Sequence, residues 1–113
     1  KRQDSWLFAK ERLKSLYVIG RSLNNDPEDA KLIKQYINIA FSAFEWDEVI
    51  RGIKKADEAG LKDDGKFALM KGIAYFEKKS ITNAKNSFIE ASNSKEYKDQ
   101  GIAWLEYLEA LNG

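Results

Sequence analysis

The chain repeats its own apolar pattern at a spacing of 35 residues, and this repetition limits the folds open to it. Eight aligned pairs are apolar or small throughout: Ile33 and Ala68, Ile37 and Gly72, Ala40 and Tyr75, Phe41 and Phe76, Trp46 and Ile81, Val49 and Ala84, Ile53 and Phe88, and Ala56 and Ala91. Self-similarity at such a period is typical of proteins built from copies of one supersecondary unit. Each copy is expected to bury its apolar face against its neighbours.

The repeated unit is predicted to be helical. Apolar residues recur at three- and four-residue steps, the chain has a single proline, and the alternation typical of strands is nearly absent. We therefore expect an all-α fold of about six helices, joined by short turns that make neighbours antiparallel. The expected helices cover residues 5–23, 27–44, 46–59, 65–78, 80–93 and 96–111.

Several helix ends carry recognisable signals. Asp26 is a good N-cap and Pro27 suits the first helical position, so the second helix is predicted to begin at residue 27. Gly60 is expected to close the third helix in a left-handed conformation. The hydroxyl groups of Ser80 and Ser94 are expected to cap the fifth and sixth helices.

The most specific spacing lies within residues 67–91. Gly72-x2-Tyr75 is followed, nine residues after the tyrosine, by Ala84-x3-Phe88. This pattern resembles the tetratricopeptide repeat (TPR), a helix–turn–helix unit of about 34 residues. The resemblance implies a short right-handed α-solenoid of stacked antiparallel helix pairs, similar to the C-terminal part of a TPR array.

The resemblance covers most of the chain and implies a single TPR-like domain, 1–113. Ser15, Ile19 and Ser22 keep the spacing of a second repeat helix, whereas the glycine position of the first whole repeat is occupied by Ile37. The domain would consist of the second helix of a partial repeat at 5–23, whole repeats at 30–64 and 65–98, and a terminal capping helix at 96–111.

Proteins of the TPR family bind peptides or partner proteins in a concave groove lined by the first helices of their repeats. Carried over by position, the groove residues are Lys34, Asn38, Phe41, Lys66, Leu69, Ile73 and Phe76. Lys34 and Asn38 lie four residues apart and could hold a carboxylate together, or they form a solvated helix face. Phe41 and Phe76 are either groove anchors or core residues, because aromatic side chains serve both roles.

An alternative function is homo-oligomerisation or assembly. A helix such as 5–23, whose usual partner helix is missing, has an apolar flank that must be covered. We expect a homodimer contact, if one forms, at Trp6, Phe8, Leu13 and Tyr17, with the helix around Trp104 as another candidate.

Composition argues against several other functions. The chain has no Cys and no His, so thiol nucleophiles, imidazole bases and the usual zinc ligands are absent. Its acidic pairs fall at expected helix starts or on a solvated face, and no glycine-rich phosphate loop is present. We therefore predict a protein that is not an enzyme and binds no cofactor or metal ion.

Charge and hydropathy argue against nucleic-acid binding and against a membrane span. Nineteen basic and eighteen acidic residues give a net charge of +1, which is no basis for binding nucleic acid. No apolar run approaches the length of a membrane span, and the mixture of 43% hydrophobic and 33% charged residues is that of a soluble domain. The absence of Cys fits the cytoplasm and the periplasm equally, so the compartment stays undecided.

Overall fold

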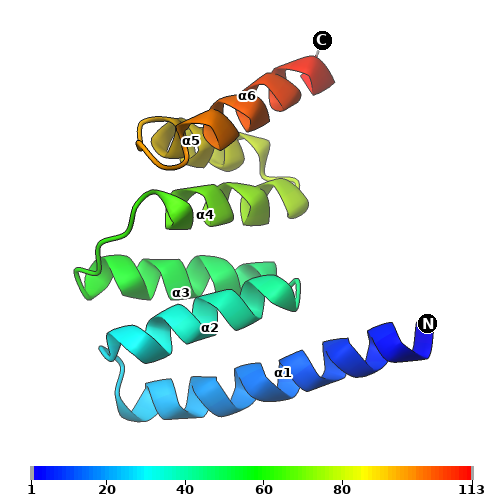
Figure 1. Cartoon of the computed structure of the whole chain (residues 1–113), viewed down its shortest axis with the longest axis vertical. Helices are drawn as coiled ribbons and strands as arrows, with labels where there is room; N and C mark the ends of the chain where they lie inside the picture. The colour runs from blue at the N-terminus through cyan, green and yellow to red at the C-terminus, as the bar shows by residue number, and fades with distance from the viewer. Residues whose placement is uncertain (1, 113) are drawn as a thin grey trace. The chain divides into compact units, whose positions relative to one another are not determined.

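The computed structural model describes residues 2–112, with side chains from Leu7 onward. All regular secondary structure in this part of the chain is helical, which confirms the all-α prediction and the expected number of helices (Figure 1). The helices are α1 (Arg2–Asn25), α2 (Ala30–Ser42), α3 (Trp46–Glu58), α4 (Lys66–Glu77), α5 (Ile81–Ser92) and α6 (Lys98–Asn112). None of the helices described here combines the length and the apolar character needed to cross a membrane.

The helices fall into two compact units. The first extends to Leu61 and holds α1–α3, and the second begins at Lys62 and holds α4–α6. In the first unit α2 packs against both α1 and α3, and in the second unit α5 packs against both α4 and α6. Successive helices within each unit run antiparallel (Figure 1). Stacking of the whole chain as one solenoid stays a prediction.

The predicted start of the second helix at residue 27 is wrong. α1 continues to Asn25, so the Asp26 amide donates hydrogen bonds of 3.1 Å to carbonyl oxygens in the last turn of α1. The side chain of Asp29, rather than that of Asp26, accepts a 3.1 Å hydrogen bond from the Leu32 amide and caps α2. Pro27 therefore lies in the turn between the two helices.

The other predicted helix ends have mixed outcomes. Gly60 has a φ of 73°, which confirms the left-handed residue after α3. Ser94 Oγ accepts a 3.1 Å hydrogen bond from the Tyr97 amide, but α6 begins only at Lys98, so this bond lies in the turn before the helix and the predicted cap at Ser94 is wrong. The prediction for Ser80 is wrong, because its side chain makes no capping hydrogen bond to any described backbone amide. Ser80 Oγ instead accepts from Asn83 Nδ2 at 2.9 Å.

The first helices of the α2–α3 and α4–α5 hairpins end in the same way. Phe44 (φ 60°) and Lys79 (φ 66°) both adopt a left-handed conformation, and they are separated by the 35-residue repeat spacing. In each case the following amide donates to a carbonyl oxygen five residues before it, at 2.9 Å for Glu45 and 2.8 Å for Ser80. This Schellman-type ending reverses the chain into the second helix of each hairpin.

The second helices of the two hairpins bury the same repeat positions. Four aligned pairs are buried in both copies: Val49 and Ala84, Gly52 and Ser87, Ile53 and Phe88, and Ala56 and Ala91. The sequence repeat is thus a repeat of core positions within two separate hairpins.

Each hairpin brings its helices together at a glycine, but the glycine is on opposite helices. In α2–α3, a Cβ atom added at Gly52 would lie 2.8 Å from Ile37 Cγ1. In α4–α5, a Cβ atom added at Gly72 would lie 2.6 Å from Phe88 Cδ1. Both separations are too short for a real contact. The first hairpin therefore tolerates Ile37 at the glycine position of the repeat because α3 provides the missing space.

Candidate binding surfaces

Three of the four predicted groove residues on α4 lie on its face toward the core of the second unit. Leu69, Ile73 and Phe76 are half-buried and pack against a cluster formed by Ala84, Phe88 and Leu108 of α5 and α6. Lys66, at the start of α4, is exposed. The α4 portion of the predicted groove is therefore an apolar face with a charged residue at one end.

Phe76 is part of an aromatic cluster that joins α4, α5 and α6. The Trp104 indole stacks on the fully buried Phe88 ring, with ring centroids 4.9 Å apart and planes 7° from parallel. The Phe76 ring meets Trp104 at 5.2 Å and Tyr107 at 5.8 Å, both edge to face. Trp104 and Tyr107 also meet edge to face, at 5.8 Å. This arrangement holds the indole between a core ring and two outer rings.

A shallow hollow opens over this aromatic cluster. Its volume is about 310 Å³, and Phe76, Ala103, Trp104 and Tyr107 line it. Tyr107 is 48% exposed, whereas Trp104 and Phe76 are half-buried. The small side chain of Ala103 leaves the faces of the larger residues accessible. The hollow is an apolar recess of the size that one or two side chains can fill.

The predicted groove residues on α2 lie in the other unit and have different surroundings. Lys34 and Asn38 are exposed. Phe41 is half-buried, and its ring packs edge to face on Trp46 at 5.4 Å, with Phe44 on the same indole at 5.8 Å. These rings support the turn between α2 and α3. A single groove that joins Lys34 and Asn38 to the α4 residues stays a prediction.

Three of the predicted dimer-contact residues on α1, Phe8, Leu13 and Tyr17, are exposed but do not share one face. Leu13 and Tyr17 line a cavity of about 510 Å³ that α1, α2 and α3 form together. Phe8 precedes Tyr17 by nine residues, or about two and a half helical turns, and so lies on the opposite side of α1. The side chain of Trp6 lies outside the described residues.

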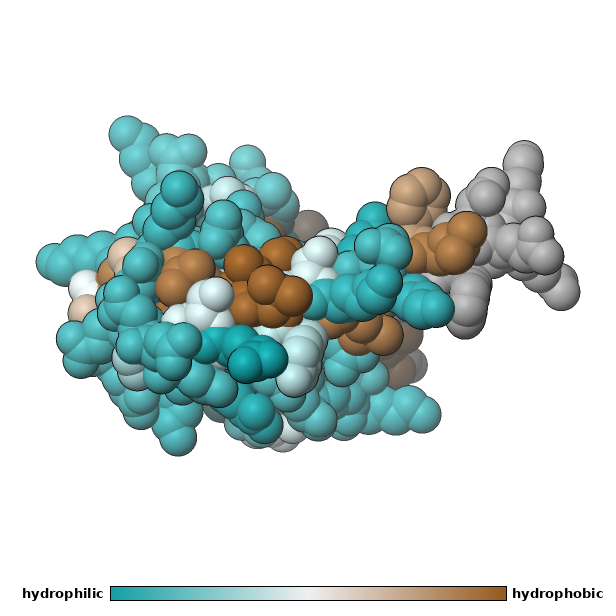
Figure 2. All heavy atoms as spheres, turned by 90° about the horizontal axis from the view of Figure 1, so that it is seen from below, coloured by the Kyte–Doolittle hydropathy of each residue, from teal (hydrophilic) through white to brown (hydrophobic). Residues whose placement is uncertain are grey.

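The side of α1 that carries Phe8 forms an apolar surface, which we call the outer stripe. Helical periodicity places on it Leu7, Phe8, Ser15, Val18, Ile19 and Ser22, with the acidic Glu11 near its middle. Leu7, Phe8 and Val18 are 49%, 62% and 59% exposed, whereas Leu16 and Leu23 on the other side are buried. Figure 2 shows hydrophobic residues on the α1 side beside the grey N-terminal atoms and again nearer the middle of the view, with hydrophilic residues between the two groups. α1 thus has exposed apolar residues on two sides.

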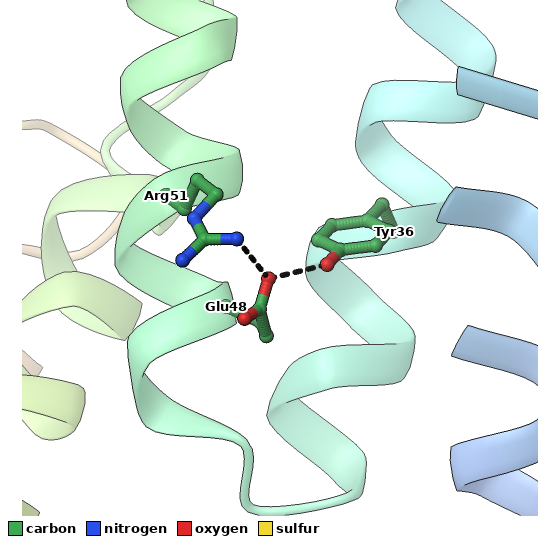
Figure 3. A network of polar contacts seen from close by, with 3 residues as sticks. All are labelled: Tyr36, Glu48 and Arg51. Carbon is green, nitrogen blue, oxygen red and sulfur yellow. Dashed lines mark hydrogen bonds and ion pairs between the residues drawn. The ribbon is translucent and has the colours of Figure 1, made fainter. Parts of the chain in front are cut away.

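A polar network in the first unit was not predicted. Tyr36 Oη on α2 donates a 2.5 Å hydrogen bond to Glu48 Oε1 on α3, and Arg51 Nη1 lies 3.3 Å from the same oxygen (Figure 3). Burial, and then the hydrogen bond to Glu48, raise the pKa of Tyr36 well above its ordinary value. Tyr36 and Glu48 are twelve positions apart and lie on different helices, so no local helical spacing could reveal the pair. The network ties the two helices of the hairpin together.

The described residues contain no group of three or more His, Cys, Asp or Glu side chains that could hold a metal ion. Comparison of the chain with protein-family models, with curated proteins and with solved structures finds no match. The functional argument therefore depends on the apolar hollow over α4 and α6 and on the outer stripe of α1.

Proposed function

We propose that this protein is a TPR-like helical-repeat scaffold, and that it binds a peptide or a segment of a partner protein in the aromatic hollow over α4 and α6. Two features within the hairpins support the repeat interpretation. The buried positions of α3 recur in α5, and the left-handed endings of α2 and α4 recur at the same 35-residue spacing. Neither feature requires knowledge of how the two units are arranged.

The half-exposed aromatic cluster is the observation that carries the binding proposal. Tyrosine and tryptophan are enriched among the residues that dominate protein–protein binding energies. They contribute a large contact area while few side-chain torsions have to be fixed. Trp104 is already held against Phe88, so little further ordering is needed when a ligand arrives.

The shape of the hollow indicates the kind of ligand. Its volume of about 310 Å³ is at the lower end of the range for small-molecule sites, and it is open at the surface. The four lining residues include no charged side chain. An apolar or aromatic side chain projecting from a peptide fits these properties better than a cofactor or a charged metabolite.

Selection from a random-peptide library displayed on phage tests this function. We expect the selected peptides to carry an apolar anchor residue and to bind at least tenfold more weakly to the Tyr107→Ala variant. Tyr17→Ala is the matched control, because Tyr17 is also exposed but lies in the first unit. Peptides that bind both variants and the original chain equally would contradict the proposal.

A second candidate function is assembly of copies of this chain through α1. The specific observation in its favour is the outer stripe, where three large apolar side chains are about half exposed or more. An exposed apolar surface of this kind is typical of interaction sites. Light scattering over a hundredfold range of concentration tests it, and a constant monomer mass would exclude self-assembly under those conditions.

A further inference from the structure

The cavity that α1, α2 and α3 form in the first unit has two unlike walls. Its volume of about 510 Å³ is within the range of small-molecule sites. On α1 it is lined by Leu13, Leu16 and Leu23, which recur at helical spacing with Gly20 among them and which we call the leucine wall. The opposite wall, formed by α3 and its N-cap, is lined only by charged residues: Glu45, Glu48, Arg51 and Lys55. A molecule in the cavity can therefore make apolar contacts on one side and polar contacts on the other.

The floor of the cavity is the Tyr36 ring of α2, which reaches both walls. A Cβ atom added at Gly20 would lie 3.3 Å from Tyr36 Cε1, and one added at Gly52 would lie 3.4 Å from Tyr36 Cδ2. The Tyr36 hydroxyl group donates to Glu48, which also pairs with Arg51 (Figure 3). The ring is thus fixed before a ligand arrives, so binding does not require it to be ordered. The same contacts compensate the charge of Glu48.

Three hydrogen-bond donors lie toward one end of the cavity. α1 and α3 both run antiparallel to α2 and are therefore parallel to each other (Figure 1). Gly20 and Gly52 meet the same ring, so they lie at one level of the cavity. Arg21 and Asn24 follow Gly20 on α1, and Lys55 follows Gly52 by three residues on α3. We call this group of two cations and one amide the donor end.

The donor end has no acceptor of its own. No hydrogen bond or ion pair joins the side chains of Arg21, Asn24 and Lys55 to another residue of the described part of the chain. The Arg21 guanidinium lies over the Tyr17 ring, with Cζ 5.9 Å from the ring centroid, and this contact leaves its N–H groups able to donate. Lys55 is half-buried, which makes an anionic partner favourable for it.

The remaining acidic residue of the cavity does not compensate the donor end. Glu45 is ten residues before Lys55, which corresponds to about 15 Å along the helix axis. This separation exceeds the screening length of about 8 Å at physiological ionic strength. Because Glu48 is compensated by Arg51, the donor end keeps an excess of positive charge.

We propose that this cavity binds a small carboxylic acid, with the carboxylate at the donor end and an apolar body along the leucine wall. The carboxylate accepts hydrogen bonds from Arg21, Asn24 and Lys55, and such charge-assisted bonds are stronger than neutral ones. The body lies over Gly20 and the Tyr36 ring and extends toward Leu13, which is 46% exposed. This site is in the first unit, so the inference is independent of peptide binding in the aromatic hollow of the second.

Titration with matched acids and amides, followed by backbone NMR shifts, tests the proposal. Octanoate supplies an aliphatic body and indolebutyrate an aromatic one, and the uncharged amide of each is its control. We expect at least one acid to bind at least about tenfold more tightly than its amide. The shifts should fall in α1–α3, and the tighter of the two acids identifies the kind of body that the cavity takes. Added salt should weaken the acid more than the amide.

A double variant assigns the preference to the donor end. Arg21→Gln with Lys55→Gln removes both cations and keeps polar side chains of similar length, so acid and amide should then bind equally. Arg12→Gln with Lys54→Gln is the matched control, because these residues lie on the same two helices, are exposed and do not line the cavity. The control should keep the preference of the original chain. Circular dichroism checks that both variants remain helical.

Several outcomes would overturn the inference. Equal binding of acid and amide to the original chain would exclude an anion site, and an equal loss of preference in the two double variants would exclude the donor end. Shifts confined to α4–α6 would place the acid in the aromatic hollow instead. Tighter binding of acetyl-leucyl-phenylalanine than of either small acid would replace a small molecule by a peptide terminus. None of these results affects the phage-display test, which depends on Tyr107 in the other unit.

Discussion

The α2–α3 and α4–α5 hairpins solve the same packing problem in opposite ways. Both end their first helix with a left-handed residue and bury the same four positions of their second helix. The first hairpin places its glycine on the second helix, against Ile37, whereas the second hairpin places it on the first helix, against Phe88. The comparison teaches that the repeat preserves one close approach between the helices of each hairpin rather than the residue at one position.

The polar contacts that join the two helices also differ between the hairpins. Tyr36 and Lys71 occupy aligned positions on the first helices, and each reaches an acidic residue on the second helix. Tyr36 is half-buried and makes a short hydrogen bond to Glu48, whereas Lys71 makes a 3.8 Å ion pair with the exposed Glu90. The Tyr36–Glu48 hydrogen bond should therefore contribute more to stability than the Lys71–Glu90 ion pair.

The largest expected effect is that of Phe88→Ala. Removing this fully buried ring leaves a cavity beside Gly72 and frees Trp104 on its other face, so the second unit should lose about 3–5 kcal/mol. Native-state hydrogen exchange can follow α4–α6 separately from α1–α3. Ile89→Ala, at an exposed neighbouring position, is the control and should cost much less. Equal losses in the two variants would show that the hairpin does not depend on this contact.

Substitution of the two contact glycines by alanine should have the next largest effect. Gly52→Ala and Gly72→Ala each force a methyl group against a large side chain, and the expected loss is about 1–2 kcal/mol after the gain in helix propensity. Urea denaturation measures both. Gly20→Ala is the control, because its nearest neighbour is the edge of the Tyr36 ring at 3.3 Å. A loss at Gly20 as large as at Gly72 would contradict the account.

Removal of the half-buried hydrogen bond between Tyr36 and Glu48 should have a smaller effect that depends on pH. Tyr36→Phe deletes the hydrogen bond to Glu48 and should cost about 1 kcal/mol at neutral pH. Folding raises the pKa of Tyr36, so its contribution is complete below pH of about 10 and is lost as the unfolded chain ionises above it. Urea denaturation at several pH values should show a shallower alkaline decline for the variant.

The aligned ion pair provides the control for that measurement. Lys71→Met should change stability by less than about 0.5 kcal/mol, because Glu90 is largely exposed and the pair is screened by solvent. If Lys71→Met and Tyr36→Phe had equal effects, the ion pair and the hydrogen bond would stabilise their own hairpins to the same degree.

A further small effect is expected to be a gain in stability. Lys79 holds a left-handed conformation that costs a non-glycine residue about 1 kcal/mol, so Lys79→Gly should raise the melting temperature of the second unit by the equivalent of about 0.5 kcal/mol. Lys78→Gly, at the preceding position, should lower it. A loss of stability in both variants would indicate that the left-handed ending is absent in solution.

Helical periodicity predicted the number and order of the helices, but local signals could not resolve competing caps. Asp26 and Asp29 are both suitable N-caps, and the choice between them depends on how far α1 extends. The extended α1 uses the Asp26 amide in its own last turn, so Asp29 caps α2. That outcome is set by both helices together, and no rule based on one position can predict it.

The candidate sites were also only partly predictable from the sequence. The TPR resemblance pointed to Phe76, but its partners Trp104 and Tyr107 lie about thirty residues further along the chain. The spacing of three between Trp104 and Tyr107 was the one sequence signal for a shared helix face. The role of Gly52 could not be predicted from its aligned position alone, because the space it provides compensates for Ile37 on another helix.

The central claim is that the two hairpins are copies of one unit, because the proposed repeat scaffold rests on their shared register. Exchanging the contact residues tests it most directly: Ile37→Gly, Gly52→Ser and Ile53→Phe give the first hairpin the residues of the second. Ile37→Gly alone should cost about 3–5 kcal/mol. If the packings are interchangeable, hydrogen exchange in α2 and α3 should show that the triple variant recovers at least half of this loss. A triple variant that loses as much as its single changes combined would contradict the claim.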